Sequence, residues 1–294
     1  MEWDFETEDI EALCEFMGSP CTQRMTRIQP LPIDQHNSPF KGQVVLITGG
    51  GTGLGRAYAR AFAKHGAKVA VTSRNLANLN ETSRKIRRNG GQAFAVTADM
   101  TKPKSIYDMV KKVTKKFGPI DLLINNHGTG GEVEAWWKLV NQNRYQETLK
   151  VNYGGAFWST GVVCQQMHDL GRSGRIINIA SSTVESRPEY LGIYAYSKHL
   201  VVEMTEAVAE GLGKGGVKIF AVHPGTVDTA MTEAMLNSPN AAKLTLLHQI
   251  FDTHQDVSEE VATELIMHVA SGEVDHLSGQ FLCRKESTVT QLQE

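Results

Sequence analysis

Tyr194 and Lys198 are the pair of residues in this chain whose types and spacing most clearly suggest chemistry. They lie four positions apart in a pattern typical of a helix, so they are expected to share one helical face. A free tyrosine, with a pKa of about 10, is a poor base at neutral pH, and a neighbouring ammonium group favours the phenolate. The pair therefore predicts a general acid/base that gives a proton to an alkoxide or takes one from an alcohol. Taken alone, the same spacing is also typical of an exposed helical pair.

Two more polar residues precede this pair at positions that suit the same reaction. Ser181 follows an apolar run and lies thirteen residues before Tyr194. Its hydroxyl is expected to donate a hydrogen bond to the substrate oxygen, with Ser182 as the competing choice. Asn152 is predicted near the middle of a helical stretch, where its amide would hold a water that relays protons to Lys198.

A glycine-rich segment, Thr48–Gly55, follows the first apolar run and precedes a helical pattern. Glycines permit a tight turn and a close approach of the backbone to a pyrophosphate, whose charge is favoured at the positive end of a helix. The spacing is Thr-Gly-x-x-x-Gly-x-Gly, and the more common Gly-x-Gly-x-x-Gly pattern does not fit because its third glycine would fall on Leu54. The segment predicts a dinucleotide site.

The end of the second apolar run indicates which dinucleotide is bound. The chain reads Val71-Thr72-Ser73-Arg74, and no acidic residue occurs between Gly55 and Glu81. An acidic residue here would hold the ribose hydroxyl of NAD, whereas an arginine accommodates the 2′-phosphate of NADP. We therefore predict NADP(H), with Arg74 as phosphate partner and Ser73 as a hydrogen-bond donor. The alternative is that Arg74 is a solvated charge at the start of a helix.

The elements that would position these residues are short buried strands alternating with helices. Short, β-branched apolar runs without polar alternation are typical of strands buried on both faces, and the βαβα order predicts one doubly wound parallel α/β sheet with helices on both faces. A last strand at 279–282 is expected at the edge. The predicted strands are 44–47, 68–71, 93–96, 120–124, 175–179 and 217–222, and the predicted helices are 54–65, 76–88, 103–117 and 194–212.

Residues 1–40 differ from this pattern and are predicted to be a leader or arm in front of a single domain, 41–294. The segment is acidic and then rich in proline, with one short amphipathic helix around Ile10–Met17. A mobile leader and an arm that packs on the domain or on a partner subunit remain open.

Bulk composition limits the partners. The formal net charge is −2, the chain has 41% hydrophobic residues, and it lacks an apolar stretch of the length needed to cross a bilayer. Neither nucleic acid nor a membrane is expected as a partner. The four cysteines have no metal-ligand spacing, so no metal site is predicted, and reduced thiols with an acidic N-terminus favour the cytoplasm.

The ordered set of motifs resembles the short-chain dehydrogenase/reductase family over roughly residues 40–283. It comprises the glycine turn, Asn125-Asn126-His127-Gly128, Asn152, Ser181, Tyr194-x-x-x-Lys198 and His223–Thr229. The resemblance implies hydride transfer between NADP(H) and a carbonyl or secondary alcohol, with Asn152, Ser181, Tyr194 and Lys198 as catalytic residues. It also implies a small-molecule substrate and a homo-oligomer, a dimer or tetramer.

The resemblance assigns further residues to the cofactor. Asp99 would bind the adenine, Asn126 would lie near its ribose, Lys198 would hold the nicotinamide ribose, and the segment from Pro224 to Thr229 would line the carboxamide. The residues expected to contact the cofactor are Gly49, Thr52, Gly53, Leu54, Gly55, Ser73, Arg74, Asp99, Met100, Asn126, Gly128, Tyr194, Lys198, Pro224, Gly225, Val227 and Thr229.

Two departures from the family pattern stand out. His127 replaces the alanine of Asn-Asn-Ala-Gly, and we interpret it as a substitution beside the cofactor, with a catalytic histidine as the alternative. The C-terminal Ser278–Arg284 segment lacks the acidic-Gly-Gly ending common in the family, which puts the usual subunit contacts of this edge in doubt.

The segment after Thr229 corresponds to a mobile lid in the family, and its apolar residues suggest a lipophilic substrate, although such residues also pack on their own domain. The same two interpretations apply to Trp136, Trp137 and Tyr190. Rival functions are an NAD-linked alcohol dehydrogenase of the same family, a redox-inactive dinucleotide sensor or scaffold, and a sugar-nucleotide epimerase or dehydratase. The lid residues in question are Met231, Met235, Leu236, Leu244, Leu246, Leu247, Ile250 and Phe251.

Overall fold

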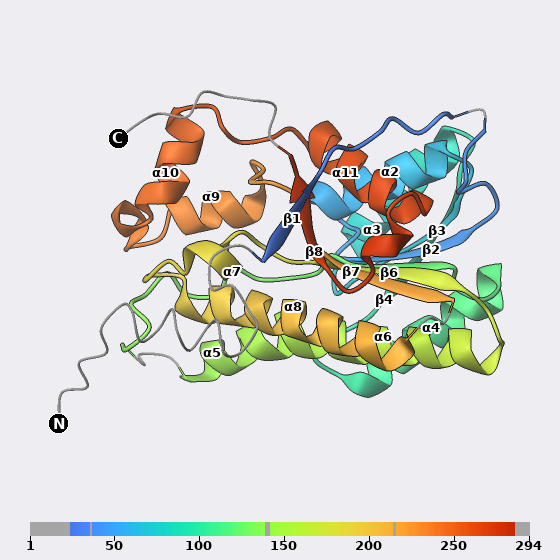
Figure 1. The fold of residues 1–294 in the computed structure, drawn as a ribbon, viewed down its shortest axis with the longest axis horizontal. Helices are drawn as coiled ribbons and strands as arrows, with labels where there is room; N and C mark the ends of the chain where they lie inside the picture. Colours follow the sequence, from blue (N-terminus) through green and yellow to red (C-terminus); the bar gives the residue numbers. More distant parts are fainter. Residues whose placement is uncertain (1–23, 36, 139–141, 214–215, 286–294) are drawn as a thin grey trace.

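The computed structural model describes residues 24–35, 37–138, 142–213 and 216–285. They form an eight-stranded sheet in which every neighbouring pair is parallel, with helices on both faces (Figure 1). The strand order is β1-β8-β7-β6-β5-β2-β3-β4. The α/β parallel sheet predicted from the sequence is confirmed. The strands are β1 (Met25–Ile28), β2 (Val44–Thr48), β3 (Lys68–Ser73), β4 (Gln92–Thr97), β5 (Leu122–Asn125), β6 (Gly174–Ile179), β7 (Val217–His223) and β8 (Phe281–Arg284).

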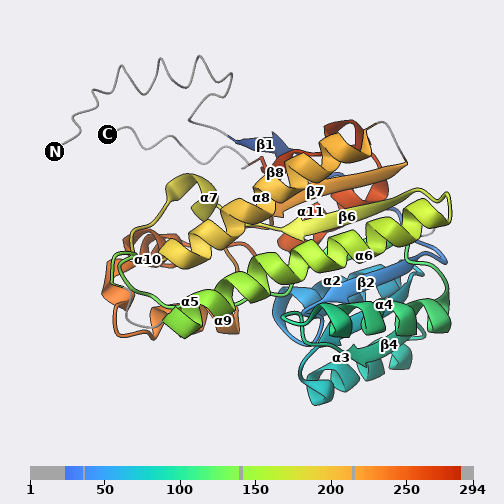
Figure 2. The same ribbon diagram turned by 90° about the horizontal axis from the view of Figure 1, so that it is seen from below.

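The helices divide between the two faces of the sheet. One layer contains α2, α3 and α11, and the other contains α4, α5, α6 and α8 (Figures 1 and 2). A short π-helical turn, Lys150–Gly154, joins α5 to α6. The helices are α2 (Gly53–Lys64), α3 (Leu76–Arg88), α4 (Pro103–Phe117), α5 (Gln142–Leu149), α6 (Gly155–Asp169), α7 (Thr183–Ser186), α8 (Gly192–Leu212), α9 (Ala230–Leu236), α10 (Thr245–Asp252) and α11 (Glu259–Ser271), with 3₁₀ turns at Ala241–Lys243 and Asp275–Leu277.

Strand β2 shows why its sequence is apolar without alternation. Val45 and Ile47 pack in the cluster under α2, α3 and α11, whereas Val44 and Leu46 pack in the cluster under α4 and α6. Successive side chains of a strand point to opposite faces, so a strand covered on both sides needs apolar residues at every position. All five residues of β2 are buried.

The order of the strands reverses direction at β2. From β2 the chain adds β3 and β4 on one side, and it then crosses over to place β5 on the other side of β2. The loops after β2 and β5 therefore separate at the carboxyl edge of the sheet and leave a crevice, which is where open α/β sheets bind ligands. These two loops contain Gly49–Gly55 and Asn126–Gly128.

The end of the sheet differs from the sequence prediction. Strand β8 forms at 281–284, but it is not the edge, because Met25–Ile28 pairs with it in parallel and becomes the outermost strand. Part of the predicted leader or arm therefore packs on the domain. The predicted helix around Ile10–Met17 lies outside the described residues, and the boundary at residue 40 stays a prediction.

Candidate active site

The turn between β2 and α2 is shaped for an anion. Gly49 and Gly53 adopt φ of 68° and 48°, which side chains disfavour. The N-cap residue of α2, Thr52, makes no side-chain capping bond, and the first turn of this helix has no acidic residue. Its N–H donors are thus left for a negatively charged ligand at the positive end of the helix dipole.

Gly55 has a second reason to be glycine. A Cβ at this position would clash with the carbonyl oxygen of Gly49 and lie 2.6 Å from Nδ2 of Asn126. That amide in turn donates to the carbonyl oxygen of Thr48 at 3.1 Å. Asn126 therefore fastens the loop after β5 to the glycine turn after β2.

Tyr194, Lys198 and Ser181 meet at the end of β6. Ser181 lies two residues after the end of the strand, and α8 begins two residues before Tyr194. Lys198 is buried, and its Nζ donates to the carbonyl oxygen of Ile179 at 2.8 Å and lies 5.8 Å from the centre of the Tyr194 ring. The three residues predicted from the sequence are thus brought together.

The electrostatics of this group differ from the sequence expectation. Burial raises the pKa of Tyr194, while the hydrogen bond with Ser181 acts in the opposite direction. Burial also lowers the pKa of Lys198 to about 8, because the apolar surroundings disfavour its ammonium form. We expected Lys198 to depress the pKa of Tyr194, and this expectation was wrong: desolvation dominates, so the phenol is protonated at neutral pH.

Asn152 lies on the π-helical turn, and both polar atoms of its amide are hydrogen-bonded. Its Oδ1 accepts from the backbone N–H of Thr129 at 2.8 Å, and its Nδ2 donates to the carbonyl oxygen of Thr129 and to Oγ of Ser197, both at 2.9 Å. A Cβ built on Gly128 would lie 3.3 Å from Oδ1 of Asn152 and 3.7 Å from Nζ of Lys198. Asn152 and Lys198 therefore both lie close to Gly128.

His127 is a buried structural link. Its Nε2 lies 3.0 Å from the carbonyl oxygen of Val151, and its Nδ1 lies 2.6 Å from Oγ1 of Thr48. A carbonyl only accepts, so Nε2 carries the proton and Nδ1 accepts from the threonine. Burial lowers the pKa of His127 to about 4, so the ring is neutral. His127 ties the π-helical turn next to Asn152 to the end of β2.

A cavity of about 890 Å³ connects the glycine turn to Ser181, Tyr194 and Lys198. Its far wall is apolar and comes from the β6–α8 connection and from α9 and α10. Tyr190 contributes to this wall, whereas Trp136 and Trp137 are 62% and 56% exposed and lie outside it. Predicted site residues that line the cavity are Gly49, Thr52, Gly53, Leu54, Gly55, Asn126, Gly128, Ser181, Tyr194, Lys198, Pro224, Gly225, Val227 and Thr229, together with the lid residues Met231, Met235, Leu244, Leu246, Leu247 and Ile250.

The remaining predicted cofactor residues lie outside this lining. The side chain of Arg74 is 72% exposed, and its Nη1 lies 3.9 Å from Oε1 of Glu147. Oγ of Ser73 accepts from the backbone N–H of Asn75. The carboxylate of Asp99 accepts from Thr101, and Met100 is buried.

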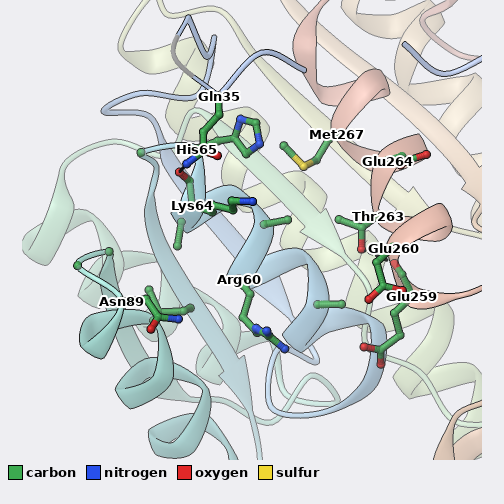
Figure 3. A pocket seen from close by; sticks show the side chains of 17 residues that line it. Gln35, Arg60, Lys64, His65, Asn89, Glu259, Glu260, Thr263, Glu264 and Met267 are labelled. Atoms are coloured by element: carbon green, nitrogen blue, oxygen red, sulfur yellow. Dashed lines mark hydrogen bonds between the residues drawn. The ribbon is translucent and has the colours of Figure 1, made fainter. Parts of the chain in front are cut away.

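A second cavity, of about 850 Å³, lies between α2, α3 and α11 (Figure 3). Arg60 and Lys64 of α2 and Glu259 and Glu260 of α11 contribute its charged lining. It contains none of the predicted site residues, and its exposed, mixed charges do not converge on one ligand group. The predicted catalytic residues Ser181, Tyr194 and Lys198 line the first cavity.

Within the described ranges, none of the helices combines the length and the apolarity needed to cross a membrane. The same part of the chain holds no group of three or more histidine, cysteine or acidic residues arranged to bind a metal ion.

Residues 43–240 match the family model described as short chain dehydrogenase. The chain belongs to the short-chain dehydrogenase/reductase family. It is an oxidoreductase that interconverts alcohol and carbonyl groups of a small-molecule substrate with a nicotinamide dinucleotide, on a Rossmann-type fold. The cavity fits that cofactor, because the glycine turn and the uncapped end of α2 open into the space that contains Tyr194 and Lys198.

Relatives of this short-chain dehydrogenase span most of its length. It is 31% identical to a 3-oxoacyl-(acyl-carrier-protein) reductase of Thermotoga maritima, over 83% of this chain and 96% of the relative. It is 32% identical to an L-rhamnose-1-dehydrogenase of Scheffersomyces stipitis, over 69% of this chain and 80% of the relative. A variant actinorhodin polyketide ketoreductase crystallised with NADPH superposes with a TM-score of 0.75 at 27% identity, covering 86% of this chain and 97% of that one.

Sequence reasoning missed two residues that hold this dehydrogenase's site. Thr129 fixes Asn152 through its backbone, and Ser197 accepts from Asn152 while donating to the carbonyl oxygen of Tyr194 at 2.7 Å. Ser197 precedes Lys198 on the buried side of α8. A small polar residue inside the Tyr-x-x-x-Lys motif was the available signal, whereas a backbone contact such as that of Thr129 leaves no trace in the sequence.

Proposed function

We propose that this protein uses NADPH to reduce the carbonyl group of a lipophilic small molecule to a secondary alcohol. The observation that carries the proposal is the position of Tyr194: it lines, beside Ser181 and Lys198, a cavity shared by the glycine turn and an apolar wall. Its phenol keeps its proton at neutral pH, because burial raises its pKa. A donor suits reduction, because the carbonyl oxygen must gain a proton.

Bound NADPH would supply a hydride to the carbonyl carbon. Tyr194 then gives its proton to the substrate oxygen, and the hydroxyl of Ser181 holds that oxygen while negative charge develops on it. Lys198, with a pKa of about 8, would return a proton to Tyr194. A water held by the second lone pair of Asn152 Oδ1 would complete this relay. Hydride and proton together convert C=O to CH–OH.

We assign cofactor binding to the residues predicted from the sequence, which follow the carboxyl ends of β2, β3, β4, β5 and β7. Gly49, Thr52 and the start of α2 would hold the pyrophosphate. Asp99 and Met100 would bound the adenine, Asn126 and Gly128 the ribose, and the segment from Pro224 to Thr229 the nicotinamide.

The preference for NADPH rests on Arg74. Its guanidinium is on the surface at the end of β3, next to Ser73, and its contact with Glu147 is long and exposed. Such an ion pair contributes little, so Arg74 remains available to a 2′-phosphate.

The cofactor assignment is tested by titrating the protein with NADPH and with NADH, following the fluorescence of the nucleotide. NADPH should bind at least about tenfold tighter, a difference of about 1.4 kcal/mol. Arg74→Ala should remove that difference, whereas Arg84→Ala, an exposed arginine on α3, should keep it. Equal binding of NADH by the wild type would overturn the NADP assignment and favour the NAD-linked alcohol dehydrogenase.

The substrate class rests on the apolar wall of the cavity. Leu191, Met235 and Leu244 are buried there with Met231 and Leu247 packed against them. A panel of aromatic and aliphatic ketones and 3-oxoacyl thioesters, assayed by NADPH oxidation, should show lower KM for longer apolar chains. KM values that do not depend on chain length would contradict this assignment, and NADPH binding without turnover of any member would favour a dinucleotide sensor.

We further propose that the protein is a homo-oligomer that uses the outer face of α6 and α8, which lie side by side in Figure 2. Phe157 and Trp158 of α6 and Tyr196 of α8 are 44%, 46% and 57% exposed. Exposed aromatic side chains on one helical layer suit an isologous contact with a second copy.

Sedimentation tests this contact. Phe157→Ser/Trp158→Ser should dissociate the assembly, and Leu170→Ser, at the far end of α6, should not. A wild-type monomer would contradict the proposal.

The absence of a disulfide-type or metal-type cysteine spacing supports a cytoplasmic location.

A further inference from the structure

The first described residues of the chain form a strap that reaches the helix carrying Tyr194 and Lys198. Arg24 precedes β1, and its guanidinium lies 2.6 Å from a carboxylate oxygen of Glu203 and 2.6 Å from one of Glu206. The same group lies 3.2 Å from Nε2 of His199, which is the residue after Lys198. All three partners are on α8, spaced so that they share one face.

The next residue of the strap contacts the other catalytic segment. The backbone N–H of Met25 donates to Oε1 of Glu185 at 2.9 Å. Glu185 belongs to the short helix α7, which begins two residues after Ser181. Two adjacent residues, Arg24 and Met25, thus connect the segment that carries Ser181 to the helix that carries Tyr194.

The strap also supplies a positive charge, the Arg24 guanidinium, to the glutamates of α8. Three glutamates contact its start. Arg24 pairs with Glu203 and Glu206, the Met25 N–H donates to Glu185, and His199 lies 3.4 Å from Glu203. Burial, the largest effect, and then the neighbouring Arg24 lower the pKa of His199, so this imidazole brings no positive charge at neutral pH. Without the side chain of Arg24, Glu203 and Glu206 would lose the cation they share, and the strap, which Met25 joins to α7, would lose its ion pairs with α8.

The strap itself has an independent anchor. Strand β1 pairs with β8 over four residues, Thr26 donates to the side chain of Gln280 at 2.6 Å, and Lys285 donates to the carbonyl oxygen of Ile28 at 2.7 Å. Removing the side chain of Arg24 therefore leaves β1 in the sheet. This separates the effect of the guanidinium from the presence of the strand.

We propose that Arg24 is a positioning residue for the reaction: by holding α7 and α8 together, it sets the position of Ser181 relative to Tyr194. The inference rests on the proposed function for its kinetic consequence, whereas its structural part does not. Residues 24–28 lie outside the family match at 43–240.

Arg24→Ala tests the proposal, with Arg24→Lys as the conservative variant and Arg284→Ala as the matched control. Arg284 is on the neighbouring strand β8 and pairs with Glu264 of α11, so its loss removes an ion pair next to β1 without touching α7 or α8. In each variant we would measure kcat, KM, the Kd for NADPH and amide hydrogen exchange, together with the isotope effect of a deuterated nicotinamide.

Arg24→Ala should lower kcat about tenfold, because misplacement of reacting groups by a fraction of an ångström carries such a cost. The Kd for NADPH should stay within about twofold, because the glycine turn is on the other half of the sheet. The isotope effect should increase as hydride transfer becomes rate-limiting, and exchange should accelerate in 183–186 and 192–206 but not in α2. Arg24→Lys should recover most of kcat, and Arg284→Ala should behave as wild type.

Faster exchange confined to 24–28 and 281–284, with kcat unchanged, would overturn the inference while the proposed function stands. A wild type that neither binds NADPH nor reduces any carbonyl would overturn the proposed function, and the exchange measurement would still decide whether Arg24 joins α7 to α8. Equal loss of kcat in Arg24→Ala and Arg284→Ala would show that Arg24 only stabilises this side of the sheet in general. That result would also overturn the inference.

Discussion

His127→Ala separates a structural histidine from a catalytic one. The substitution removes the hydrogen bonds of the ring to Thr48 and to the carbonyl oxygen of Val151. Each lost hydrogen bond costs about 1 kcal/mol. The space of the imidazole adds a cavity beside Gly155, whose absent side chain makes room for the ring. The free energy of unfolding should fall by about 3 kcal/mol at pH 7.

Protonation gives this prediction a second test. The pKa of His127 is about 4 in the folded protein, against 6.5 for the free residue. Because the unfolded state then binds more protons, the wild type should lose up to about 3 kcal/mol as the pH falls from 6.5 to 4. The alanine variant lacks this contribution, so the stability difference should be full above pH 6.5 and should shrink toward pH 4.

Urea unfolding from pH 4.5 to 7.5 measures both effects. Other buried histidines, such as His223, contribute equally to the wild type and the variant and cancel in the difference. The Kd for NADPH should remain within a fewfold of the wild type. A variant with unchanged stability and a rate reduced more than about 100-fold would refute the structural role and restore His127 as a catalytic residue.

Two further predictions concern the site itself. The rate of carbonyl reduction should fall as the pH rises through about 8, because Lys198 loses its proton there, and a pH–rate profile that is flat to pH 9.5 would contradict its role. Gly55→Ala should lower the free energy of unfolding by about 1–3 kcal/mol and weaken NADPH binding, because the new Cβ would clash with Gly49. The control Gly161→Ala, which meets no atom within 4 Å, should do neither in thermal unfolding and nucleotide titration.

The sequence predicted the regular elements well because their patterns are local. The helices Leu76–Arg88 and Pro103–Phe117 were predicted with the bounds that the structure has, since each shows an apolar face and a clear start. Burial on both faces required a run of apolar side chains in β2, and this pattern allowed the parallel sheet to be predicted.

The features that were not predicted from the sequence depend on partners that are distant in the sequence. Met25–Ile28 has no strand pattern of its own, and it forms β1 because β8, more than 250 residues later, offers an unpaired edge. The π-helical turn that carries Asn152 follows from no residue preference, and the link from His127 to Val151 joins a side chain to a backbone atom. The pKa of Tyr194 was predicted in the wrong direction because spacing gives proximity to Lys198 but not the extent of burial.

The measurement that tests the account most directly is single-turnover oxidation of bound NADPH by the best carbonyl substrate, in the wild type and in Tyr194→Phe. Phenylalanine keeps the ring but removes the proton donor. The account predicts that the variant binds NADPH as the wild type does and that its hydride-transfer rate falls at least about 100-fold. A variant that oxidises NADPH within a fewfold of the wild-type rate would contradict the assignment of Tyr194 as the acid.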